Sequence, residues 1–213
     1  MATIFGTAGN NVLAGGAGAD LILGYDPVDP SPDGNDNLTG NAGNDSLYGG
    51  DGNDTLNGNM GNDSLYGGDG NDFLNGGMSS DRLFGGNGDD TLLGGLGADT
   101  MTDGSGDDVY RYVNVTDSTP GLGNRDILTD FTSGFDKIDL SPIDSDILDF
   151  GNQAFAFIGM GAFTGVGDGQ VRYFQQGGNT IIQVDRQGDG NIIPEMEIQL
   201  TGLINPVAGD FIL

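Results

Sequence analysis

Apolar side chains recur at every ninth position through the first half of the chain. Each follows an aspartate by two places, and a glycine-rich stretch separates one such pair from the next. The apolar series is Leu38, Leu47, Leu56, Leu65, Leu74, Leu83, Leu92, Met101 and Tyr110. An apolar residue with one neighbour on each side predicts a very short strand of about three residues, whose middle side chain faces a core. The glycines between the strands predict turns, because glycine adopts positive φ without a steric penalty.

Nine-residue units of this kind predict a parallel β-roll. Two units close one turn of a flattened right-handed coil, so that loops on the same side are 18 residues apart, as Asp45 is from Asp63. Stacked repeats bury one continuous core. We therefore predict an all-β chain in which residues 1–111 form a parallel β-roll. The stretch Asp26–Asp33 (DPVDPSPD) breaks the spacing, and its prolines predict a surface loop inserted between two strands.

The second half of the chain has a different pattern. The glycine repeat stops after Arg111, and apolar runs separated by turn residues predict longer strands. These runs are Asp126–Leu128, Lys137–Leu140, Gln170–Phe174, Thr180–Val184 and Glu197–Leu203. We predict a separate β-rich C-terminal cap over residues 112–213.

Composition shows that apolar burial alone does not hold the roll together. Of 213 residues, 42 are glycine and only 36% are hydrophobic. About one leucine per nine residues does not offset roughly 1–2 kcal/mol of backbone entropy per residue, so the repeats alone would form a disordered linker. The chain has no cysteine, and disulfides therefore do not supply the missing stability.

The charge of the chain indicates what supplies it. The net charge is −26, and every acidic residue except Glu195 and Glu197 is an aspartate, whose carboxylate lies close to the backbone. This bias indicates cation coordination. The same charge repels nucleic-acid phosphates and anionic membranes, so we expect no nucleic-acid partner. No apolar stretch is long enough for a membrane span, and residues 1–9 carry no signal-peptide pattern.

The repeat itself points to calcium. Its pattern is GGxGxDxUx, in which U is a large apolar residue, and it occurs as GGDGNDTLN and GGDGNDFLN. Carbonyl and carboxylate oxygens stacked between successive loops would form an all-oxygen cage. Such a cage suits calcium better than magnesium, because calcium tolerates irregular coordination. Over Gly15–Arg111 the chain resembles the RTX (repeats-in-toxin) family with hemolysin-type calcium-binding repeats, and we expect several Ca2+ ions as cofactors.

The resemblance to RTX proteins also implies a ligand scheme. The second and fourth residues of one loop contribute carbonyls, the first and third residues of the loop two repeats later contribute carbonyls, and both loops contribute their aspartate. One site would combine two triplets: Gly50, Gly52 and Asp54 with Gly67, Asp69 and Asp72. The expected metal ligands are Gly16, Gly18, Asp20, Asp36, Asn41, Gly43, Asp45, Gly50, Gly52, Asp54, Gly58, Met60, Asp63, Gly67, Asp69, Asp72, Gly76, Met78, Asp81, Gly85, Asn87, Asp90, Gly94, Leu96, Asp99 and Asp108. Ser79 replaces a glycine of its loop, and Asn11 and the insertion disturb the first turn, so the resemblance does not establish ion sites at these places.

The second half resembles the C-terminal domain that follows the roll in serralysin-type proteases. The resemblance rests on DILTDFTSGFDKIDLSPID, GAFTGVGDGQVRYF and GGNTIIQVDRQGDGNIIPEMEIQLTGL. It implies a β-rich cap that closes the open end of the roll. Within the cap, Asp185–Glu197 resembles the start of an EF-hand loop but has Met196 at the twelfth position instead of glutamate. A polar hairpin turn and an additional ion site both remain open for this segment.

The last residues, Asp210 to Leu213, are an acidic residue followed by three apolar ones. This ending resembles the uncleaved signal of type I secretion substrates in Gram-negative bacteria. It implies an extracellular protein whose partner during export is the type I secretion apparatus, and a loosely held terminus. The alternative is that Phe211–Leu213 forms the last strand of the cap.

No catalytic constellation is evident in the sequence. The chain has no histidine and no cysteine, which excludes a HExxH zinc site, a Ser/His/Asp triad and thiol catalysis. We expect a non-catalytic, secreted calcium-binding protein, favoured because Met1 directly precedes the first repeat. A second interpretation is a module that binds extracellular polysaccharide through Tyr48, Tyr66 and Phe84, similar to the R-modules of alginate epimerases. A third is the secretion and folding module of a larger hydrolase with a fused enzyme domain.

Overall fold

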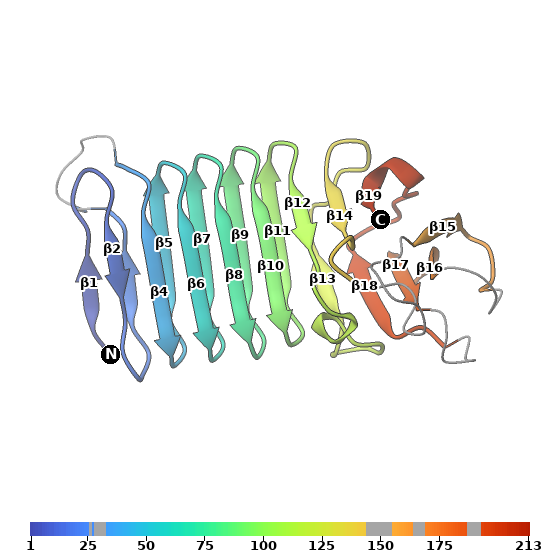
Figure 1. The fold of residues 1–213 in the computed structure, drawn as a ribbon, viewed down its shortest axis with the longest axis horizontal. Coiled ribbons are helices and arrows are strands. Elements are labelled where there is room, and N and C mark those ends of the chain that lie inside the picture. Colours follow the sequence, from blue (N-terminus) through green and yellow to red (C-terminus); the bar gives the residue numbers. More distant parts are fainter. Residues whose placement is uncertain (26, 28–32, 144–154, 164–168, 187–192) are drawn as a thin grey trace.

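A computed structural model shows a flattened roll of short strands that continues into a β-rich cap (Figure 1). The structure describes residues 1–25, 27, 33–143, 155–163, 169–186 and 193–213. Most of the inserted stretch Asp26–Asp33 therefore lies outside the described residues, as does the middle of the segment that resembles an EF-hand loop. The predicted fold class, an all-β chain with a parallel roll, is confirmed.

The strands of the roll alternate between two sheets. One sheet contains β1 (Thr3–Phe5), β3 (Leu21–Leu23), β5 (Ser46–Asp51), β7 (Ser64–Asp69), β9 (Arg82–Asn87) and β11 (Thr100–Ser105). The other contains β2 (Val12–Ala14), β4 (Asn37–Ala42), β6 (Thr55–Met60), β8 (Phe73–Met78), β10 (Thr91–Leu96) and β12 (Val109–Arg111). Neighbours within each sheet are parallel, and Leu47 pairs with Leu65, one full turn further along the chain. Two nonapeptides therefore form one turn, as predicted.

The strands from β4 to β11 are longer than predicted. Each has six residues instead of three, because the chain stays extended after the apolar triplet and pairs a second time. Between β6 and β8 the pairing passes from Asn57 with Asn75 to Asn59 with Gly77 and skips the intervening glycine. The first glycine of these repeats thus interrupts the pairing without ending the strand.

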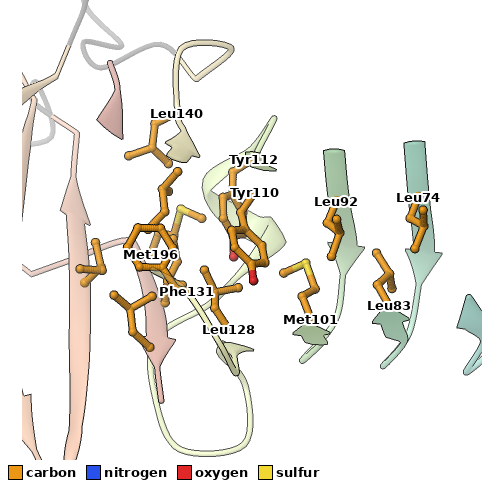
Figure 2. Close-up of a cluster of buried hydrophobic side chains, with 14 of the residues drawn as sticks. Leu74, Leu83, Leu92, Met101, Tyr110, Tyr112, Leu128, Phe131, Leu140 and Met196 are labelled. Atoms are coloured by element: carbon orange, nitrogen blue, oxygen red, sulfur yellow. The ribbon is translucent and has the colours of Figure 1, made fainter. Parts of the chain in front are cut away.

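The interior of the roll is a single file of side chains. The leucines that follow each aspartate by two places in β4 to β10 are fully buried: Leu38, Leu47, Leu56, Leu65, Leu74, Leu83 and Leu92. Figure 2 shows this file passing from Leu74, Leu83, Leu92 and Met101 into the cap residues Leu128, Phe131 and Met196. Burying one leucine contributes about 1.5–3 kcal/mol, whereas ordering nine residues costs several times more. The core aligns the turns, but a second source of stability is needed.

The cap extends both sheets of the roll. Strand β13 (Asp126–Leu128) pairs with β11, and β14 (Lys137–Asp139) pairs with β12. The remaining strands are β15 (Ala156–Gly159), β16 (Gln170–Gln176), β17 (Asn179–Asp185), β18 (Met196–Leu200) and β19 (Phe211–Ile212). Strands β16, β17 and β18 form an antiparallel sheet, which the roll does not contain. All five strands predicted for this half are confirmed, with ends shifted by a few residues.

The C-terminus is part of the folded cap. Strand β19 pairs with β14, and the ring of Phe211 stacks on that of Phe157 with centroids 5.0 Å apart. The Asp210 carboxylate is fully buried and accepts hydrogen bonds from Ser133 Oγ at 2.6 Å and from the Gly134 N–H at 2.9 Å. The prediction of a loosely held terminus is therefore wrong, because the terminal apolar residues complete a sheet.

The only helices among the described residues are two short 3-10 turns, η1 (Val115–Asp117) and η2 (Ala208–Asp210). Neither is long or apolar enough to cross a membrane.

Candidate calcium sites in the loops of the roll

Two columns of aspartates run along the roll, one on each side. Column A lies in the loops before the odd-numbered strands and contains Asp20, Asp45, Asp63, Asp81 and Asp99; it ends at Asp126, the first residue of β13. Column B lies in the loops before the even-numbered strands and contains Asp36, Asp54, Asp72, Asp90, Asp108 and Asp136. Every one of these side chains is buried, with at most 7% of its surface exposed. Twelve buried carboxylates in so small a fold require compensation by hydrogen bonds or cations.

One oxygen of each carboxylate is fixed by the backbone. The N–H of Asp45 donates to Asp63 Oδ1 at 2.7 Å, and the N–H of Asp63 donates to Asp81 Oδ1 at 2.7 Å. The same bond links each aspartate to the next one in its column, as far as Asp126 and Asp136 in the cap. These ladders hold every carboxylate in one orientation.

The second carboxylate oxygen has no hydrogen-bond partner at most of these positions. Buried and unsatisfied Oδ2 atoms occur in Asp36, Asp45, Asp54, Asp63, Asp72, Asp81, Asp90, Asp99 and Asp126. Burial is the main cause that raises the pKa of Asp81 to about 8 and the pKa of Asp54 to about 7, and neighbouring aspartates add to it. A divalent cation between the loops would satisfy these oxygens, so the residues present fit calcium.

The first glycine of each repeat keeps open the space that Oδ2 faces. A Cβ atom on Gly49 would lie 2.2 Å from Asp54 Oδ2 and 2.5 Å from the carbonyl oxygen of Gly67. The same arrangement recurs at Gly58, with Asp63 Oδ2 at 2.3 Å and the Gly76 oxygen at 2.6 Å. The structure thus brings together the aspartate of one loop and the first carbonyl of the loop two repeats later, two members of the predicted ligand set.

Carbonyls at the second and fourth positions point toward the next loop on the same side of the roll. Gly50 and Gly52 have φ of 120° and 118°. Their carbonyl oxygens lie 2.0 and 2.1 Å from where Cβ atoms of Gly68 and Gly70 would stand. The carbonyl at the third position is already engaged, since Asp69 O accepts a hydrogen bond from the Gly52 N–H at 2.7 Å. A carbonyl has a second lone pair, so this bond leaves it able to bind an ion.

Residues that depart from glycine keep the loop conformation. Asn41 and Asn59, at second positions, both have φ of 77°, and Ser79, at a fourth position, has φ of 84°. The Ser79 N–H donates to Leu96 O at 2.7 Å, as glycines do at this position. The loop that contains Ser79 therefore keeps the backbone conformation of the other loops. Asparagine and serine adopt positive φ at a modest cost, which the neighbouring loops offset here.

A cluster at the junction with the cap was missed by the sequence scheme. Carboxylate oxygens of Asp103, Asp108 and Asp136 lie within 4.8 Å of one another. Asp103 replaces the first glycine of its repeat, and burial, followed by contact with Asp130, raises its pKa to about 9. The signal was present in the sequence: DGSGDDVYR is one more nonapeptide, and DFTSGFD returns an aspartate to column B. This cluster is also suited to a hard cation.

The predicted sugar-contacting aromatic residues form a stacked column on the outer face of β5, β7 and β9. Ring centroids of Tyr48 and Tyr66 are 4.5 Å apart, and those of Tyr66 and Phe84 are 4.8 Å apart, with planes inclined by 5° and 2°. Both faces of the Tyr66 ring are therefore covered by its neighbours. Stacking on a sugar needs a free ring face, so this arrangement does not favour binding at Tyr66. Polysaccharide binding stays a prediction, which a glycan-array screen in calcium tests.

Two family models match the chain and together cover almost all of it. The model described as "Peptidase M10 serralysin C terminal" matches residues 66–213. The model described as "RTX calcium-binding nonapeptide repeat (4 copies)" matches residues 3–26 and 33–65. Among solved structures, the chain is similar to the AlgE6R3 subunit of the Azotobacter vinelandii mannuronan C5-epimerase, with 21% identity and a TM-score of 0.39. The match covers 98% of this chain and 80% of the epimerase subunit. No curated protein matches the sequence.

Proposed function

Because the chain belongs to the family described as peptidase M10 serralysin C terminal and carries RTX calcium-binding nonapeptide repeats, we propose that it is a secreted, non-catalytic module. This module folds outside the cell as several calcium ions bind between the turns of its roll. The observation that supports this proposal is the series of buried aspartate Oδ2 atoms without partners. Those from Asp36 to Asp99 lie beside the first glycine of their own repeat, in loops rich in backbone carbonyls.

The residues that would hold each ion follow the predicted scheme. In column B, Gly50, Gly52 and Asp54 would act with three residues of the next loop: Gly67, Asp69 and Asp72. Calcium supplies positive charge and accepts six to eight oxygen ligands, which matches three residues from each of two loops. The chain's own part is to hold these oxygens in place through the aspartate ladder and the glycine turns.

Calcium titration tests this function. Extracellular modules bind calcium with dissociation constants of roughly 0.1–1 mM, above the level inside cells. Protein prepared in chelator should gain its β-type circular dichroism spectrum cooperatively as calcium rises through this range. Magnesium at the same concentration should not replace calcium, because it demands tighter octahedral geometry. A full β spectrum in chelator, or equal folding in magnesium, would contradict the proposal.

We assign no catalytic role to the chain. The aspartates that could act as acid–base pairs are arranged in two columns whose spacing follows the repeat, and coordination accounts for them. The chain contains no histidine. The partners that we propose for the chain are calcium ions and the type I secretion apparatus.

Export through that apparatus is the second part of the proposal, and the last four residues test it. Deleting Asp210–Leu213 should abolish secretion from a cell that carries a type I system. It should also lower the melting temperature in calcium, because Asp210 and Phe211 are buried. The double variant Ser133→Ala with Phe157→Ala serves as a matched control, since it weakens the same contacts without altering the terminus. If the control is exported and the deletion is not, the terminus acts as a signal. Normal export of the deletion variant would refute this role.

A further inference from the structure

Asn11 occupies the first place of column B, where every later member is an aspartate. Its N–H donates to Asp36 Oδ1 at 2.7 Å, the same bond that the aspartates of the column make. The backbone of this turn is therefore in register with the rest of the column. The difference lies in the side chain, which carries an amide in place of a carboxylate.

The amide nitrogen of Asn11 is surrounded by oxygens. It lies 2.8 Å from Thr7 O, 3.3 Å from Gly24 O and 3.2 Å from Asp36 Oδ1, and it also donates to Gly9 O. Thr7 and Gly9 are the second and fourth residues of their loop, and Gly24 is the first residue of the next loop on that side. These four oxygens correspond to ligand positions of the scheme proposed for calcium.

The orientation of the amide follows from its surroundings. Asn11 Oδ1 accepts hydrogen bonds from the Thr7 N–H and the Thr7 hydroxyl, both at 3.2 Å. Turning the amide over would place Oδ1 against four oxygens, which is unfavourable without a cation. An amide group donates two hydrogens and carries partial positive charge on them, so it satisfies acceptors that would otherwise need an ion.

We propose that the side-chain amide of Asn11 takes the place of a calcium ion, so that the first turn of column B closes without metal. The proposal rests on the function assigned to the other loops. Column A begins in a related way, because both oxygens of Asp20 accept backbone N–H groups, from Ala2 at 2.5 Å and from Gly16 at 2.7 Å. The N-terminal end of the roll is thereby held by hydrogen bonds, whereas the interior turns depend on ions.

Counting bound calcium ions tests the proposal. Native mass spectrometry of the full chain in calcium gives the number of ions per molecule for the wild type and for variants. Asn11→Asp should bind one ion more than the wild type, because the carboxylate can no longer donate to the surrounding oxygens and instead becomes a ligand. Asn11→Ala should bind the same number as the wild type but melt at a lower temperature. Asn10→Asp is the matched control: it adds the same charge in the same loop at an exposed position, and its count should not change.

The opposite pattern would overturn the proposal. If Asn11 were itself a calcium ligand through Oδ1, Asn11→Asp would leave the count unchanged and Asn11→Ala would lose one ion. Equal counts in all variants would also refute it, since the oxygens would then not form a cation site. A wild type that binds no calcium at all would instead contradict the proposed function, so the two failures are distinguishable.

Discussion

The roll and the cap fill their interiors by different means. In the roll, each nonapeptide after the first contributes one apolar side chain and one buried aspartate, and most of those aspartates have an unsatisfied oxygen. In the cap, the antiparallel strands β17 and β18 each contribute several apolar side chains, such as Ile182, Val184 and Ile198. On the proposed function, this difference in the interior separates a region that needs an ion from a region that buries more apolar surface.

Removal of calcium should separate the two regions most strongly. In chelator we expect strands β4 to β11 to lose their amide protection, because buried carboxylates about 5 Å apart, one strand spacing, repel one another without a cation. Some protection should remain in β17 and β18, because each of these strands buries several apolar side chains. Hydrogen–deuterium exchange with and without calcium measures this difference. Equal loss of protection in both regions would show that the cap depends on the roll.

A second test compares interior and terminal aspartates. Asp63→Ala removes Oδ2 from the gap between loops and leaves the Asp45 N–H without its acceptor, a hydrogen bond to a charged group that is worth about 1.5–3 kcal/mol. Asp20→Ala should do less, because both oxygens of Asp20 already accept backbone N–H groups. We therefore expect the calcium midpoint of folding to rise more for Asp63→Ala. Equal midpoints would contradict the ligand scheme.

Glycine substitutions in the roll and in the cap should give the next largest difference in stability between the two regions. Gly67→Ala places a Cβ 2.2 Å from Asp72 Oδ2 and 2.6 Å from Gly85 O, and the resulting overpacking should cost about 1–3 kcal/mol. Gly209→Ala, in the cap, meets nothing within 4 Å. Neither residue has a positive φ, so the two variants differ in space and not in backbone strain. A large drop in the melting temperature of calcium-bound Gly67→Ala, with little change for Gly209→Ala, is the expected result. Equal drops in melting temperature for the two variants would mean that the first glycine of the repeat is not needed to keep open the space beside the aspartate Oδ2.

The smallest effect concerns pH in the absence of calcium. Burial raises the pKa of Asp81 from 3.8 to about 8, so its contribution favours the folded roll at low pH and is lost as pH rises through about 8. In the cap, burial acts to raise the pKa of Asp139, but hydrogen bonds from Ser141 and Arg111 hold it below 3.8. Its contribution is present above pH 3.8 and lost only in stronger acid. Circular dichroism in chelator should therefore show residual roll structure decreasing from pH 4 to pH 8. An increase over this range would contradict the assignment.

Much of the roll could be predicted from the sequence because its contacts follow a fixed period. A residue in one turn lies beside its counterpart 18 residues later. The spacing of Asp45 and Asp63 in the sequence therefore already places them in adjacent turns, where the Asp45 N–H donates to Asp63 Oδ1. The fold class and the aspartates of both columns as far as Asp108 required no other information. The proposed site inherits this regularity, since each loop repeats the same backbone.

The tertiary structure decided what happens where the period ends. Asp126 and Asp136 extend the two columns at intervals of 27 and 28 residues instead of 18, so the period of two nonapeptides per turn does not predict their pairing. Strand β19 reaches its partner β14 across seventy residues of the cap, so the sequence alone did not distinguish a free terminus from a final strand. The side chain of Asn11 is a smaller example. The sequence shows its position in the repeat, but the two loops that meet there determine which of its atoms faces the oxygens. Periodic contacts follow from the spacing of the repeat and recur in every turn. The contacts of Asp126, Asp136, β19 and Asn11 each occur once, between segments that only the folded chain brings together.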